Sequence, residues 1–95
     1  MNPIRQFEMQ CTHAEFLREL PMACQKRPYE IIGERVIVHD NGREIFIRVH
    51  DEPIRHLGSL DLPMEEITMK FIDYTEEEAD NFLSVFKRHT LRGGG

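Results

Sequence analysis

The stretch that decides the fold is residues 31–49, which read IIGERVIVHDNGREIFIRV. Two runs rich in β-branched residues flank the dipeptide Asn41-Gly42. Because both central residues of a type I′ turn need a positive φ, Asn-Gly at this place predicts a β-hairpin with a two-residue loop. The expected strands are residues 31–38 and 44–49, and the turn sets their register.

This register sorts the side chains onto two faces, because successive residues of a strand point to opposite sides of a sheet. One face is mostly apolar and is expected to be buried. Its cross-strand pairs are Val38–Ile45, Val36–Ile47 and Glu34–Val49, with Asp40–Arg43 next to the turn. The other face is expected to remain open. Its pairs are His39–Glu44, Ile37–Phe46, Arg35–Arg48 and Gly33–His50.

The open face is the leading candidate for a functional surface, because it gathers basic and apolar residues on an acidic chain. The candidate partner-binding residues are Arg35, Ile37, His39, Phe46, Arg48 and His50, with Lys70 as a further cation. Two arginines directly opposite each other cost a few tenths of a kcal/mol unless an anion lies between them. Arginine also binds oxyanions through two parallel hydrogen bonds. The face therefore predicts docking of an acidic partner, a second copy of the chain or a phosphate-bearing ligand.

A simpler interpretation of the same face is that nothing docks there. Glu44 and solvent would then satisfy the arginines, and Ile37 and Phe46 would be ordinary exposed apolar residues.

The N-terminal part predicts one strand and one helix. Apolar and polar residues alternate over residues 4–10, which indicates a strand. Thr12 and Glu15 match a capping box and predict a helix that begins directly afterwards. Because proline lacks an N–H and disfavours helical geometry in the preceding residue, this helix is expected to cover 13–20 and end before Pro21.

The C-terminal part predicts a long connection, a strand and a helix. Residues 51–64 are expected to be an irregular crossing, and the alternation over 65–73 predicts a further strand. Apolar residues at 60, 62 and 64 leave open an extension of this strand as an edge segment. Thr75 and Glu78 form a second capping box, and the i, i+3, i+4, i+7 apolar spacing predicts a helix over 76–90.

The order of elements, (β)-α-β-β-β-α, predicts the α+β class. The simplest packing is an antiparallel three- to four-stranded sheet with two helices packed on one face. We expect a single domain over residues 1–92, followed by a flexible glycine tail at 93–95.

Composition excludes several classes of function. The 95 residues carry 17 acidic and 12 basic side chains, a net charge of −5. This charge disfavours nucleic acid and anionic membranes as partners. No apolar run has the ~20 residues of a membrane span, and the N-terminus lacks the apolar core of a signal peptide. With only two cysteines, we expect a cytoplasmic protein with reduced thiols.

The order of elements also resembles the double-stranded-RNA-binding domain, which runs α-β-β-β-α. That family contacts phosphates with lysines at the start of its last helix. This chain instead has four carboxylates there, Glu76, Glu77, Glu78 and Asp80. Carboxylates repel a phosphate backbone, so the resemblance covers the order of elements and predicts no RNA binding.

Two alternatives to a docking module come from the termini. Cys11, His13 and Cys24 suggest a small-ligand or metal-binding domain, but zinc sites usually repeat a close ligand pair, so we expect no metal and no cofactor. The tail Leu91-Arg92-Gly93-Gly94-Gly95 resembles the ends of ubiquitin-like and sulfur-carrier proteins, which implies a carrier activated at its C-terminus. A frayed, glycine-rich helix end is the simpler interpretation.

No catalytic signature is present: the chain has neither a glycine-rich phosphate loop nor a nucleophile elbow. The leading prediction is therefore a non-enzymatic protein-interaction or self-associating module that uses the open face.

Overall fold

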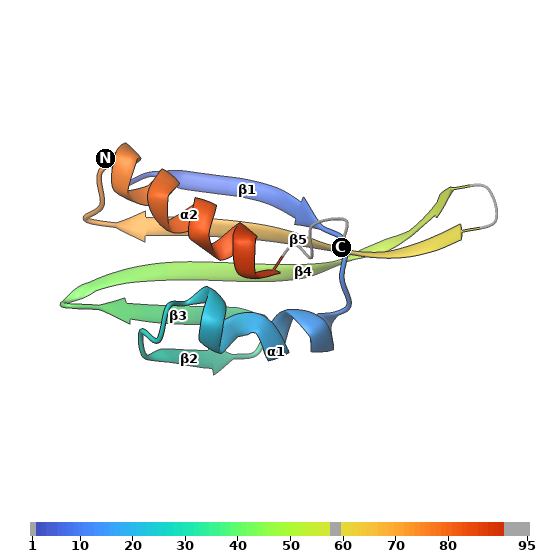
Figure 1. Cartoon of the computed structure of the whole chain (residues 1–95), viewed down its shortest axis with the longest axis horizontal. Coiled ribbons are helices and arrows are strands. Elements are labelled where there is room, and N and C mark those ends of the chain that lie inside the picture. Colours follow the sequence, from blue (N-terminus) through green and yellow to red (C-terminus); the bar gives the residue numbers. More distant parts are fainter. Residues whose placement is uncertain (1, 58–59, 91–95) are drawn as a thin grey trace.

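The computed structural model describes the backbone of residues 2–57 and 60–90, and their side chains except at 51–57, 60–63 and 90. One antiparallel sheet has the strand order β1-β5-β4-β3-β2, and two helices lie on one of its faces (Figure 1). The elements are β1 (Ile4–Met9), α1 (His13–Ala23), β2 (Tyr29–Ile32), β3 (Arg35–Asp40), β4 (Arg43–Leu57), β5 (Leu60–Ile72) and α2 (Glu76–Thr90). The predicted α+β class is confirmed, although the sheet has five strands instead of three or four.

The central hairpin forms as predicted. Asn41 and Gly42 have φ values of 50° and 86°, as a type I′ turn requires. The register predicted from this turn is confirmed for all six residue pairs that join β3 to β4. The two faces of the sheet are therefore those that the sequence predicted.

The single strand predicted over residues 31–38 is wrong, because this stretch belongs to two strands. The chain reverses at Gly33 (φ 61°) and Glu34, between β2 and β3. The carbonyl of Glu34 still accepts a hydrogen bond from the N–H of Val49 (2.9 Å), but Glu34 lies outside β3. The predicted pairs Glu34–Val49 and Gly33–His50 are therefore not part of the ladder. Because β-branched residues lie on both sides of Gly33, the sequence pattern indicated one continuous strand and not this turn.

The irregular crossing predicted over residues 51–64 is also wrong. β4 continues to Leu57 and β5 begins at Leu60, so the two strands form a long hairpin that extends beyond the helices (Figure 1). The ladder is irregular only between Glu52 and Arg55, where a proline cannot donate a backbone hydrogen bond. The alternative extension of β5 back to residue 60 agrees with the structure.

Helix α1 is longer than predicted, because Pro21 lies inside it and does not end it. The proline removes the N–H that would bond to the carbonyl of Leu17. The next turn still closes, since Cys24 donates its N–H to the carbonyl of Leu20 at 2.8 Å. Burial of Leu20, Ala23 and Cys24 stabilises this last turn.

Other predicted features are confirmed. Both capping boxes form, Thr12 with Glu15 and Thr75 with Glu78. The first strand and the last helix lie within a residue of their predicted ends. The tail predicted at 93–95 lies outside the described residues.

The hydrophobic core lies between the helices and one face of the sheet. Its centre is a group of aromatic rings with centroid distances of 6.1 Å for Phe16–Phe86, 5.8 Å for Phe71–Phe82 and 5.9 Å for Phe82–Phe86. The sheet contributes the predicted apolar face, Val36, Val38, Ile45 and Ile47, all of them buried. Both described helices cover this face, and no described helix lies on the opposite face.

Candidate functional site

The uncovered face of the sheet has a shallow hollow at its centre. β3, β4 and β5 surround it with three cations, three apolar residues and one threonine. The hollow has a volume of about 250 Å³ and is lined by Arg35, Ile37, Phe46, Ile47, Arg48, Thr68 and Lys70. We call these residues the basic depression. Four of the six residues predicted from the sequence lie in it: Arg35, Ile37, Phe46 and Arg48.

The strand register brings the three cations of the basic depression together. Arg35 lies opposite Arg48, and Lys70 lies opposite Phe46, two residues along β4 from Arg48. Opposite Cβ atoms in antiparallel strands are about 4.5–5.5 Å apart, and diagonal neighbours about 7–8 Å. A single oxyanion can therefore contact more than one of these cations.

The cations of the basic depression have no partner within the described part of the chain: no hydrogen bond or ion pair joins Arg35, Arg48 or Lys70 to another residue. Three other arginines are paired. These pairs are Arg5–Asp80 (2.9 Å), Arg27–Asp40 (3.3 Å) and Arg43–Glu78 (2.9 Å). None of the described side chains therefore neutralises the positive charge of the depression.

The two predicted histidines do not line the depression but lie beside it. His39 contacts Glu30 (Nε2–Oε2 2.7 Å) and Glu44 (Nδ1–Oε2 3.6 Å), and His50 contacts Glu34 (3.5 Å). Glu44 therefore pairs with a histidine, and not with the arginines as the simpler interpretation of the face expected. These pairs give the depression a partly acidic border.

Apolar residues extend the depression toward both edges of the sheet. Phe46, at the centre of the depression, is 38% exposed. Ile32, opposite Arg35, and Ile4, opposite Lys70, are both more than half exposed. Sequence reasoning missed Ile4, Ile32 and Thr68, because their positions depend on strand pairs that the Asn-Gly turn does not determine.

A second polar cluster lies at the end of the sheet that carries the Asn-Gly turn. The buried carboxylate of Asp40 accepts a hydrogen bond from the hydroxyl of Tyr74 at 2.6 Å, and Arg27 and Arg43 lie within 3.4 Å of it. The Tyr74 hydrogen bond, and then the two guanidinium groups, lower the pKa of Asp40. Burial and the same hydrogen bond raise the pKa of Tyr74.

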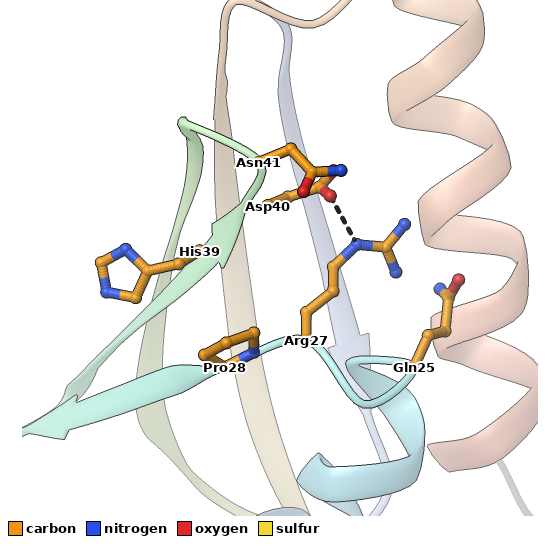
Figure 2. Close-up of a pocket in the computed structure, with 6 residues that line it drawn as sticks. All are labelled: Gln25, Arg27, Pro28, His39, Asp40 and Asn41. Atoms are coloured by element: carbon orange, nitrogen blue, oxygen red, sulfur yellow. Dashed lines mark ion pairs between the residues drawn. The ribbon is translucent and has the colours of Figure 1, made fainter.

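This cluster connects four parts of the chain: the α1–β2 loop, β3, the start of β4 and the segment before α2. Figure 2 shows the side chain of Arg27 directed toward Asp40. The sequence indicated only the local pair of Asp40 with Arg43. Tyr74 is 34 residues from Asp40 and carried no sequence signal of this contact.

The cysteines of the metal-binding alternative are buried thiols. Burial raises the pKa of Cys11 and of Cys24 to about 11. His13 lies 3.2 Å from the buried carboxylate of Glu65. In the part of the chain that the structure describes, no three His, Cys, Asp or Glu side chains gather as metal ligands would.

Among the described helices, none is both long and apolar enough to cross a bilayer. Comparison with known proteins assigns the chain to no family and gives it no function. No protein-family model matches the chain, and neither a curated protein nor a solved structure does. The candidate functions therefore follow from the residues of the basic depression and of the polar cluster themselves.

Proposed function

We propose that this protein is a non-enzymatic interaction module that docks an acidic segment of a partner protein on the basic depression. The observation that carries the proposal is the group of three cations around exposed Phe46 that have no partner among the described residues. A chain with a net charge of −5 has acidic side chains to neutralise them, yet three of those near the face, Glu30, Glu34 and Glu44, contact histidines instead.

A carboxylate between Arg35 and Arg48 relieves the repulsion between their guanidinium groups. It also accepts two parallel hydrogen bonds from either guanidinium fork. Lys70 adds a third positive charge on the diagonal. Charge complementarity therefore favours a partner segment that is rich in Asp and Glu.

Ion pairs alone give too little free energy for stable docking. An exposed ion pair contributes about 0–1 kcal/mol, whereas full burial of a Phe or Leu side chain contributes about 1.5–3 kcal/mol. The partner segment should therefore place an apolar side chain against Phe46 and Ile37, with its acidic residues on either side.

A second copy of the chain fits the depression less well. In a two-fold interface each residue faces the same patch on the other copy. Centred on the depression, such an interface would bring two sets of cations together. The net charge of −5 on each copy adds a further repulsion.

The proposal is tested with a fluorescently labelled hexapeptide that has one Phe between flanking Asp residues. Fluorescence anisotropy should show saturable binding that weakens as salt concentration rises. The same peptide with Lys for Asp should not bind, and one with Ser for Phe should bind more weakly.

The decisive variant is Arg35→Glu with Arg48→Glu. Its matched control is Arg18→Glu with Arg88→Glu, which makes the same change in net charge on the exposed surfaces of the two helices. Only the first variant should lose binding. Equal losses of binding in both variants would show a non-specific effect of net charge and would contradict the proposal. Sedimentation tests the alternative occupant. If the wild type forms dimers and only the first variant is monomeric, a second copy of the chain would replace the acidic partner.

A further inference from the structure

The side chains of the basic depression form two rows across β5, β4 and β3. The first row has an apolar pair with a cation at one end, and consists of Lys70, Phe46 and Ile37. The second row has two cations with a hydroxyl at one end, and consists of Thr68, Arg48 and Arg35. The rows are two residues apart along each strand, which corresponds to about 6.8 Å. The depression therefore changes from apolar to cationic over the length of one large side chain.

The hollow over these two rows is suited to one side chain. Its volume of about 250 Å³ is below the ~300–1,000 Å³ of most small-molecule sites. Phe46 is exposed and Ile37 is half-buried, so both can be contacted from solvent. Aromatic rings pack favourably against each other in stacked or edge-to-face arrangements. An aromatic side chain of a docked segment therefore fits the apolar row.

Carboxylates border the two rows on the same face of the sheet. They are Glu30 on β2, Glu44 on β4 and Glu66 on β5, each next to a residue of one row. Neighbouring positions on one face are about 5–7 Å apart, which is less than the Debye length at physiological ionic strength. A segment with several acidic residues would place some of them near these carboxylates. The favoured segment therefore concentrates its negative charge in one residue over the cations.

A phosphate group concentrates negative charge in this way. A phosphorylated side chain carries a charge of about −1.5 to −2 and three acceptor oxygens at neutral pH, more than a carboxylate carries. Arg35 and Arg48 can each donate two parallel hydrogen bonds to a phosphate. Neither has a partner among the described residues, and the same is true of Lys70. A phosphate bound there disrupts no ion pair of the described structure.

The order of the two rows selects the residue that carries the phosphate. Phosphotyrosine has an aromatic ring followed by a phosphate, in the order of the apolar and the cationic row, whereas phosphoserine has no ring to contact Phe46. We infer that the basic depression binds a phosphorylated tyrosine of the partner segment. Its ring packs against Phe46 and Ile37, and its phosphate lies between Arg35 and Arg48. This inference rests on the proposed docking function and names the residue at the centre of the docked segment.

The test compares labelled hexapeptides that share uncharged Gly and Ser flanks and differ at one central position. That position holds phosphotyrosine, tyrosine or phosphoserine, and the Asp-flanked Phe hexapeptide is the acidic comparison. Fluorescence anisotropy with the full chain should show that the phosphotyrosine peptide binds at least about ten-fold more tightly than each of the others. It alone combines the ring contact with charge-assisted hydrogen bonds to a phosphate.

Two variants separate the ring contact from the phosphate contact. Phe46→Ala should weaken binding of the phosphotyrosine peptide about ten-fold and leave binding of the phosphoserine peptide unchanged. Arg35→Gln with Arg48→Gln should abolish the preference for phosphotyrosine over tyrosine. The matched control, Arg18→Gln with Arg88→Gln on the exposed surfaces of the helices, should retain that preference. Thermal unfolding checks that each variant is folded, and the arginine variant, whose replaced side chains are exposed, tests the inference independently of Phe46→Ala.

The outcomes distinguish this inference from the docking function. If the acidic hexapeptide binds but the phosphotyrosine peptide binds no more tightly than the tyrosine or phosphoserine peptide, the inference is wrong and the docking function stands. If no peptide binds, both are wrong. Equal loss of the phosphotyrosine preference in the arginine variant and its control would also overturn the inference. Binding of the phosphotyrosine peptide alone would support it and would restrict docking to phosphorylated partners.

Discussion

Replacing Tyr74 with Phe removes one hydroxyl and tests whether the buried cluster around Asp40 stabilises the fold. The hydroxyl donates to Asp40 Oδ2 at 2.6 Å, in a buried hydrogen bond to a charged acceptor. Such bonds contribute about 1.5–3 kcal/mol. The ring itself is retained, and with it the edge contact to Phe71 (centroids 5.4 Å) and the position of the Arg43 guanidinium 3.9 Å from the ring centroid.

Urea denaturation at neutral pH should therefore show a loss of about 1.5–3 kcal/mol in the free energy of unfolding. For a domain of this size, that loss corresponds to a fall of roughly 10 °C in melting temperature. Tyr29→Phe is the matched control. Tyr29 is partly exposed, and no hydrogen bond of its hydroxyl is found within the described residues, so its replacement should change stability by less than about 0.5 kcal/mol.

The effect of Tyr74→Phe should also depend on pH. The pKa of Asp40 is lowered in the folded state, first by the Tyr74 hydrogen bond. A lowered pKa contributes stability that is present above the unfolded-state pKa of ~3.9 and is lost as pH falls through the folded-state value. The difference between wild type and variant should therefore be greatest near neutral pH and should shrink below pH ~4. A loss below about 0.5 kcal/mol, or one that stays constant down to acid pH, would refute the reasoning.

Three other substitutions or reactions test further parts of the structure. Pro21→Ala restores a helical N–H at an exposed position, so urea denaturation should show a domain that is more stable by about 1 kcal/mol. A loss of stability would contradict the helix that passes through this residue. Phe16→Ala empties a fully buried site against Phe86 and should lower the free energy of unfolding, measured by thermal unfolding, by about 3–5 kcal/mol. A decrease below about 1 kcal/mol would contradict the place of Phe16 in the core. Burial raises the pKa of Cys11 and Cys24 to about 11. Both thiols should therefore react with a disulfide reagent at pH 8 much more slowly in the native protein than in urea, and equal rates would contradict their burial.

The parts of the fold that were predictable from sequence depend on local signals. The Asn41-Gly42 turn determined a register of two strands, and the pattern of each strand then determined which face is buried. The capping boxes located the starts of both helices in the same way. These features need only neighbouring residues, so a single sequence contains them.

The errors arose where long-range contacts decided the outcome. Pro21 remains helical because residues on either side of it in the same turn, Leu20, Ala23 and Cys24, are buried in the core. Local helix propensity does not include this burial. The long β4–β5 hairpin and the separate strand β2 depend on pairing partners distant in sequence. For the same reason the sequence identified Arg35 and Arg48 but could not show that Thr68 and Ile32 flank them on the neighbouring strands.

The most direct test of the docking function observes the guanidinium groups themselves. The Nε–Hε resonances of Arg35 and Arg48 can be followed by NMR while the acidic hexapeptide is added, with those of Arg18 and Arg88 as internal controls. The account predicts saturable shifts of the first two resonances at the same peptide concentration, and little change in the controls. Shifts of equal size in all four, or shifts confined to the arginines of the helices, would contradict docking on the basic depression.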